Sequence, residues 1–207
     1  MSEVFKEACV ETLEQARLAE RCGAGRVELC ASLNVGGLTP ADGLISQTVG
    51  TLRIPVMVMV RPRAGDFVAS ETEFEAMKRT IDFCKNVNAT GVVFGLLTQE
   101  NEVDIERTAT LAQMAQPLQV TFHKAIDETR DILKAVAALK SIGGVTRILS
   151  SGGAATALRG VPILRQMISA AGPELTVIAA GRITKDNLPK VHQAIGAPEY
   201  HGRRIVF

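Results

Sequence analysis

Short runs rich in β-branched and apolar residues alternate with longer amphipathic stretches along almost the whole chain. This alternation is typical of β/α units, in which helices join parallel strands. Strands are predicted near residues 4–10, 26–30, 56–61, 91–97, 118–123, 146–150, 175–180 and 199–201. Helices are predicted between them, near 12–22, 40–50, 71–86, 104–115, 130–141, 155–170 and 185–195.

Eight parallel strands are the number that closes a barrel, so the pattern predicts an α/β fold of the TIM (β/α)8 type. A doubly wound sheet with fewer strands is the alternative. No low-complexity linker interrupts the 207 residues, which predicts a single domain over 1–207. Only "GRRIVF" follows the last predicted strand, so we expect the final helix of the barrel to be missing. The apolar tail 205–207 is expected to dock on its own barrel or to bind a second copy.

Composition narrows the range of partners. The formal net charge is +1 and no Lys/Arg-rich block is present, which argues against a nucleic-acid surface. No apolar run is long enough to span a membrane, and the N-terminus has no signal-peptide pattern. We therefore expect a cytoplasmic protein without a membrane partner. Its four cysteines, at positions 9, 22, 30 and 84, are then expected to be reduced thiols, and they lack CxxC spacing.

Polar residues share one face of several predicted strands, near their carboxyl ends. Because side chains alternate along a strand, Glu7 lies on the same face as Cys9, and Glu28 on the same face as Cys30. The third and fifth strands place Arg61 and His123 on the corresponding face. The intervening Val, Leu and Phe residues would meet the helices, so the polar face is expected to point into the barrel. Barrel enzymes hold their active sites at this end.

The sequence leaves two hypotheses for the function open. These residues support one of them, an enzyme that acts on a small anionic substrate, either phosphorylated or sugar-like. Glu28 or His123 would be the general base, and Arg61 with Arg63 would clamp a carboxylate or phosphate. Glu28 and Arg61, on adjacent strands, are expected to form an ion pair. The catalytic candidates are Glu28, Arg61, Arg63, Asp66, His123 and Asp127. A variant of this hypothesis holds a divalent metal with Glu7, Glu28, His123 and Asp127.

Glycine-containing loops after the sixth and seventh predicted strands are candidates for anion binding. Glycine lets backbone amides approach a ligand closely, and a helix N-terminus favours negative charge. The candidate residues in "SSGG" and "AAGRIT" are Ser151, Gly152, Gly153, Gly181 and Arg182.

Five stretches occur in an order that resembles the CutC family: "RVELC", "GGLTP", "RPRAGDF", "GVVFGLLT" and "VTFHKAID". Two departures from the usual family pattern are mild: Ala64 stands where a glycine is common, and "HKAID" where "HRAFD" is frequent. The resemblance implies copper homeostasis proteins with a TIM-barrel fold, which are cytoplasmic and often homo-oligomeric. It also implies Cu(I) binding through Cys9 and Cys30.

Thiolates are soft ligands that select Cu(I), so a two-cysteine site is chemically reasonable. Metal–sulfur bonds of about 2.3 Å place two thiolates on opposite sides of an ion about 4.6 Å apart. Adjacent strands are separated by about 4.7–4.9 Å, so cysteines at one level would bracket a two-coordinate ion. Met59 or His123 is a candidate further ligand. The alternative is that Cys9 and Cys30 are small buried apolar residues, as expected for Cys22 and Cys84 in helices. The copper ion and the small anionic ligand both remain candidates.

Overall fold

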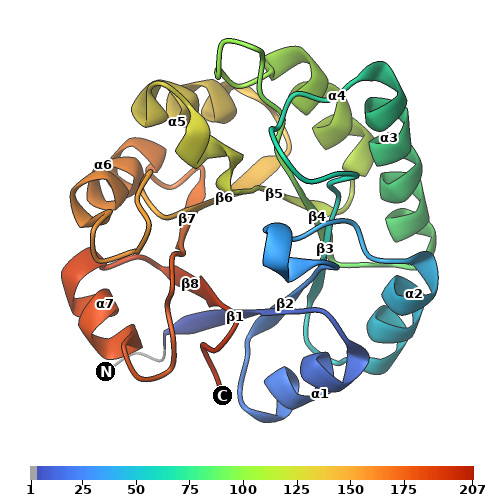
Figure 1. Cartoon of the computed structure of the whole chain (residues 1–207), viewed down its shortest axis with the longest axis horizontal. Helices are drawn as coiled ribbons and strands as arrows, with labels where there is room; N and C mark the ends of the chain where they lie inside the picture. Colours follow the sequence, from blue (N-terminus) through green and yellow to red (C-terminus); the bar gives the residue numbers. More distant parts are fainter. Residues whose placement is uncertain (1–3) are drawn as a thin grey trace.

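A closed barrel of eight parallel strands forms the centre of the molecule (Figure 1). The structure is a computed structural model that describes residues 4–207. Each strand pairs with its neighbours in chain order, and β8 closes the ring on β1. The strands are β1 (Phe5–Val10), β2 (Arg26–Leu29), β3 (Val56–Met59), β4 (Gly91–Phe94), β5 (Gln119–Phe122), β6 (Val145–Ser150), β7 (Thr176–Ala179) and β8 (Glu199–Gly202). The expected TIM-type barrel is confirmed.

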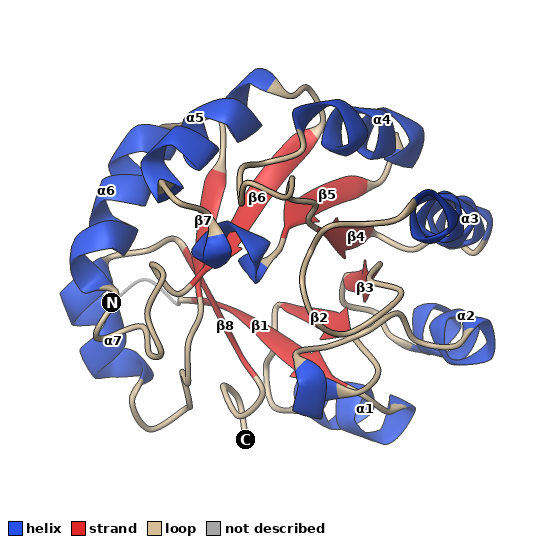
Figure 2. Ribbon diagram, turned by 45° about the horizontal axis from the view of Figure 1, so that its top comes forward, coloured by secondary structure: helices blue, strands red, loops and turns tan. Residues whose placement is uncertain are grey.

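Seven α-helices surround the barrel (Figures 1 and 2). They are α1 (Leu13–Arg21), α2 (Asp42–Thr51), α3 (Glu71–Asn86), α4 (Ile105–Ala115), α5 (Ile132–Ser141), α6 (Val161–Ala171) and α7 (Leu188–Ile195). Two short 3-10 helices, η1 (Leu33–Val35) and η2 (Lys124–Glu128), follow β2 and β5 and were missed by the sequence analysis. Both lie at the carboxyl ends of strands, where the candidate site was expected.

Two helices begin three or more residues later than predicted. The stretch assigned to 155–170 becomes helical only at Val161, because residues 154–160 form turns packed against the loop after β6. A side chain at Gly160 would meet the Ser151 carbonyl oxygen, so this turn requires glycine. The stretch assigned to 185–195 becomes helical at Leu188. In both helices a proline in the first turn marks the true start.

The C-terminal segment follows the expectation from its apolar sequence. Residues 203–207 form no helix, and Ile205 and Val206 are buried in the hydrophobic core of their own barrel. The C-terminus lies between α7 and α1, the two helices that flank the gap in the ring (Figures 1 and 2). Docking on its own barrel is therefore confirmed for these two residues, whereas Phe207 is exposed.

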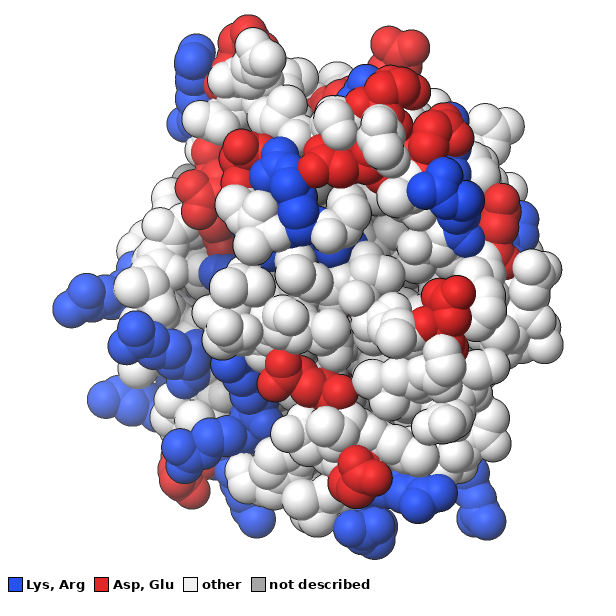
Figure 3. All heavy atoms as spheres, turned by 45° about the vertical axis from the view of Figure 1, so that its right-hand side comes forward, with Lys and Arg blue, Asp and Glu red and all other residues white. Residues whose placement is uncertain are grey.

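No helix among residues 4–207 combines the length and apolar character needed to cross a membrane. On the face drawn in Figure 3, Lys and Arg side chains gather at the lower left and Asp and Glu side chains gather along the top.

A buried layer of ion pairs fills the amino-terminal end of the barrel. The Arg26 guanidinium is only 2% exposed and donates to the carboxylates of Glu7 and Glu199, the latter at 2.5 Å. Arg147 lies 3.5 Å from Glu199 and donates to the Gln119 side-chain oxygen at 2.6 Å. Buried charges are tolerated only when they are paired in this way.

We predict that Arg26→Ala lowers the free energy of unfolding by about 3–5 kcal/mol, because it leaves two buried carboxylates without their guanidinium. Urea unfolding followed by circular dichroism measures the change. Arg21→Ala, at the exposed end of α1, is the matched control and should change the free energy by less than about 0.5 kcal/mol. Equal effects of the two substitutions would contradict a structural role for the Arg26 layer.

Candidate metal and thiol site at the barrel mouth

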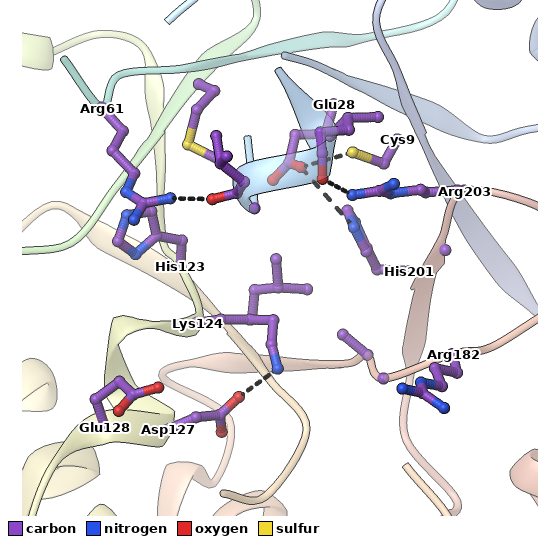
Figure 4. A pocket seen from close by; sticks show the side chains of 18 of the residues that line it. Cys9, Glu28, Arg61, His123, Lys124, Asp127, Glu128, Arg182, His201 and Arg203 are labelled. Carbon is purple, nitrogen blue, oxygen red and sulfur yellow. Dashed lines mark hydrogen bonds and ion pairs between the residues drawn. The ribbon is translucent and has the colours of Figure 1, made fainter. Parts of the chain in front are cut away.

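A cavity of about 930 Å³ opens at the carboxyl ends of the strands (Figure 4). Its walls come from the loops that follow each strand from β2 to β8. Inward side chains of the strands line the part that reaches into the barrel, among them Cys9, Glu28, Met59 and His201. This is the end of the barrel at which the sequence placed the polar residues.

Two thiols meet in this part of the barrel. The sulfur atoms of Cys9 and Cys30 are 3.8 Å apart, and they lie 3.2 and 3.3 Å from the same Glu28 carboxyl oxygen. The strand register aligns Cys9 with Glu28, so the two cysteines do not lie at one level of the ladder. Cys30 comes directly after β2 and is offset by two positions. The stagger between barrel strands brings the sulfurs together despite this offset.

His201 on β8 completes the site and was missed by the sequence analysis. Its Nδ1 lies 2.8 Å from Glu7 Oε1, and its Nε2 lies 3.8 Å from Glu28 Oε2. The metal-binding groups available are therefore Cys9–Glu28–Cys30 and Glu7–Glu28–His201, each with its ligand atoms within 4.8 Å of one another. The hypothesis of a divalent metal, made from the sequence, combined Glu7 and Glu28 with His123 and Asp127 and did not include His201. The sequence could have identified His201, because side-chain alternation along residues 199–201 places it on the same strand face as Glu199.

One thiolate is stabilised by these contacts. The hydrogen bond from the Cys30 thiol, assisted by His201, lowers the pKa of Cys9 to about 5 against the opposing effect of burial. The same hydrogen bond raises the pKa of Cys30 well above its ordinary value. Burial, followed by the negative charge of Cys9, raises the pKa of Glu28 well above its usual range. Of the three groups, Cys9 is therefore the one that ionises most readily, and its hydrogen-bond partners are the Cys30 thiol and the Glu28 carboxyl group.

The charges of His201 and Glu7 stabilise the Cys9 thiolate. Burial alone would lower the pKa of His201, but Glu28, Cys9 and Glu7 together raise it well above its ordinary value. Burial likewise opposes ionisation of Glu7, yet His201 and Arg26 outweigh it and lower the pKa of Glu7 to about 2. An imidazolium thus lies between the Glu7 carboxylate and the Cys9 thiolate.

Arg61 does not pair with Glu28, and that expectation is wrong. Its guanidinium donates to three backbone carbonyls, those of Val35 at 3.2 Å, Gly37 at 3.3 Å and Gly65 at 2.8 Å. It also lies over the Phe67 ring, 4.7 Å from the ring centroid. The loops after β2 and β3 fold over the guanidinium and hold it away from the barrel interior.

Arg63 and Asp66 form a separate contact on the outer side of this loop. Arg63 pairs with Asp66 and with Glu73 on α3, both at 2.6 Å. Asp66 contributes to the cavity wall, whereas Arg63 is not one of the residues that line the cavity. The clamp expected from Arg61 and Arg63 together does not form in this structure.

His123 lies in the cavity wall as a neutral imidazole. Burial, assisted by the positive charge of Arg61, lowers the pKa of His123 to about 3. Its Nδ1 accepts a hydrogen bond from the Ala125 amide at 3.2 Å, so the proton resides on Nε2. Nε2 is buried without a hydrogen-bond partner among residues 4–207. An unsatisfied buried donor of this kind requires an explanation.

Asp127 accepts the hydrogen bonds of the loop that was expected to bind an anion. It pairs with Lys124 at 2.8 Å and accepts from the amides of Ser151 and Gly153, both at 2.9 Å. The hydroxyl of Ser150 donates to the same carboxylate at 2.5 Å.

The remaining anion-binding candidates divide into two groups. The Gly152 amide donates to the Ser150 hydroxyl at 2.8 Å, so it is turned away from an external ligand. Gly181 and Arg182 do line the cavity.

We predict that Cys9 stays ionised until the pH falls through about 5, against an ordinary value of 9.0. The difference in thiolate ultraviolet absorbance between the wild type and Cys9→Ser measures this ionisation. It should persist at neutral pH and disappear only below about pH 5. Cys22→Ser, which removes an exposed thiol, is the control. Loss of the Cys9 signal already near pH 9 would contradict the described hydrogen bonds.

Comparison with known proteins identifies the relatives of this chain. The CutC family model matches residues 4–206. The copper homeostasis protein cutC homolog of Mus musculus is 42% identical over 94% of this chain and 71% of its own length. The family protein CutC of Pasteurella multocida (strain Pm70) is 38% identical over 94% of this chain and 80% of its own length.

A solved structure gives the same result. The crystal structure of a Streptococcus agalactiae protein described as a CutC copper homeostasis protein superimposes with a TM-score of 0.93. The two chains are 30% identical, and the match covers 98% of this chain and 100% of the other. The family match and these relatives extend over nearly all of the described residues. The chain belongs to the CutC family.

Proposed function

We propose that this chain is a cytoplasmic copper homeostasis protein that binds Cu(I) through Cys9 and Cys30. The observation that carries the proposal is the pair of buried sulfur atoms 3.8 Å apart at the inner end of an open cavity. Sulfur donors in a water-poor site select Cu(I) over harder cations. The relatives named for copper homeostasis support the same ion.

The residues around the two thiols are compatible with Cu(I) binding. Cys9 is ionised at neutral pH, so only the Cys30 proton has to leave when the ion binds. Glu28 and His201 hold the Cys9 sulfur by hydrogen bonding and charge. Met59 belongs to the same buried apolar cluster as both cysteines and offers a thioether beside them. The two remaining cysteines lie elsewhere, Cys22 at the exposed end of α1 and Cys84 within α3.

The family resemblance also supports a homo-oligomer as part of this proposal. Light scattering of the purified protein gives its mass in solution, and a monomeric mass of 22.1 kDa would contradict this part alone.

We predict that the double variant Cys9→Ser/Cys30→Ser binds Cu(I) at least about 100-fold more weakly than the wild type, because both soft ligands are removed. Competition with a chromogenic Cu(I) chelator under anaerobic, reducing conditions measures the affinity. Cys22→Ser should retain wild-type affinity, and circular dichroism checks that each variant is folded. Unchanged affinity in the double variant would contradict the proposed site.

A further inference from the structure

Four arginines around the cavity have no ion-pair partner among the described residues: Arg61, Arg182, Arg203 and Arg204. We call them the arginine cluster. All four line the cavity, and Figure 4 shows Arg61 on one side with Arg182 and Arg203 on the other. Within residues 4–207, the side-chain hydrogen bonds of Arg61 and Arg203 all go to backbone carbonyls. Those contacts orient the guanidinium groups without neutralising their charge.

The carboxylates that line the same cavity do not balance the arginine cluster. Asp127 is paired with Lys124, and Asp66 is paired with Arg63. Glu28 is directed at the thiols, with its Oε2 3.2 Å from the Cys9 sulfur. Glu128 is the one lining carboxylate of residues 4–207 without an ion pair or a hydrogen bond. The cavity therefore carries an excess of positive charge, which attracts anions and repels free cations.

A second observation indicates that a hydrogen-bond acceptor is missing beside His123. His123 is 4% exposed, it lines the cavity, and its Nε2–H has no partner. Its ring is fixed by the Ala125 amide on the other nitrogen and by the edge of Phe67, with ring centroids 5.0 Å apart. A ligand oxygen would satisfy this donor.

The thiol pair is reached through this positively charged cavity. Cys9 lines the cavity, while Cys30 is fully buried behind it. An ion arriving at the sulfurs must therefore pass the arginine cluster. In a reducing compartment Cu(I) is held by soft thiolates, and a Cu(I) ion with two thiolates carries a net negative charge. A complex of this charge is attracted to the cavity, whereas the bare ion is repelled.

The spacing of the sulfurs also leaves room for a third ligand. With metal–sulfur bonds of about 2.3 Å, sulfurs 3.8 Å apart subtend about 111° at an ion, far from the 180° of a two-coordinate centre. The remaining coordination position is open to a ligand from the cavity that Cys9 lines.

On the basis of the proposed Cu(I) function, we propose that the arginine cluster binds the carboxylates of a low-molecular-weight thiol that delivers Cu(I) to Cys9 and Cys30. The carrier arrives as a Cu(I) ion with two thiolates. Bonds form from copper to both cysteine sulfurs, and one carrier thiolate leaves with the proton of the Cys30 thiol. The second carrier thiolate stays as the third ligand, and copper remains Cu(I) throughout.

The test compares two carriers. Stopped-flow spectroscopy follows Cu(I) transfer to the full chain from its glutathione complex, which carries carboxylates, and from its cysteamine complex, which does not. Arg182→Gln/Arg204→Gln should slow transfer from glutathione about tenfold, because electrostatic attraction of the carrier is lost. The same variant should take Cu(I) from cysteamine at least as fast as the wild type, because that complex carries protonated amines and no carboxylates. Added salt should slow the glutathione reaction of the wild type.

Arg21→Gln/Arg53→Gln is the matched control, since it removes two exposed arginines near the amino-terminal end of the barrel. It should leave both rates unchanged. Equal slowing with both carriers, or no slowing with glutathione, would overturn the role of the arginine cluster. X-ray absorption should find one more sulfur ligand with glutathione present than without it, and equal numbers would overturn the retained thiolate. If the wild type bound no Cu(I) at Cys9 and Cys30, this result would instead overturn the Cu(I)-binding function on which the carrier proposal rests.

Discussion

The Glu7 carboxylate connects the structural and the functional layers of the barrel. It accepts from Arg26 on one side and lies 2.8 Å from His201 on the other. His201 in turn stabilises the negative charge of Cys9, and Glu28 Oε2 lies 3.2 Å from the same sulfur. Opposite charges thus alternate from Arg26 through Glu7 and His201 to Cys9. A buried chain of this kind is stable only when every member is paired, so the thiolate depends on the ion pairs beneath it.

The site that results differs from a general acid–base centre. Of the residues considered for catalysis, all but Arg63 line the cavity, where Glu28 lies at the thiols and Asp127 lies beside Lys124. Each of these charged groups is occupied by an internal partner. The sulfur pair, in contrast, is held at the inner end of an open cavity. This arrangement is the reason that metal binding, and not proton transfer to a substrate, is the function proposed above.

The cavity adds selectivity that two thiols alone do not provide. A site reached through uncompensated guanidinium groups discriminates by the charge of what carries the ion, before any bond to sulfur forms. The arginines concerned lie on loops, whereas the sulfurs lie on or next to strands. Access and ligation are therefore assigned to different parts of the fold, the loops and the rigid barrel.

Much of this arrangement follows from local sequence patterns. The alternation of strands and helices determined the barrel, and the period of two along strands placed Glu7, Cys9 and Glu28 inside it. The same rule reaches His201 on the last strand, where it was not applied. Helix starts at Val161 and Leu188 were missed because the preceding loops pack through tertiary contacts, which leave only a proline as a local mark.

Only the tertiary structure decided which partners each side chain meets. The sequence places Glu28 and Arg61 on adjacent strands, but two loops capture the Arg61 guanidinium. It also places Cys9 and Cys30 on neighbouring strands, but the stagger of the closed barrel determines their 3.8 Å separation. Alternation along a strand is a local property of the backbone, so the sequence by itself determined which residues face inward. Stagger and loop packing depend on contacts between distant segments, and only the folded barrel sets them.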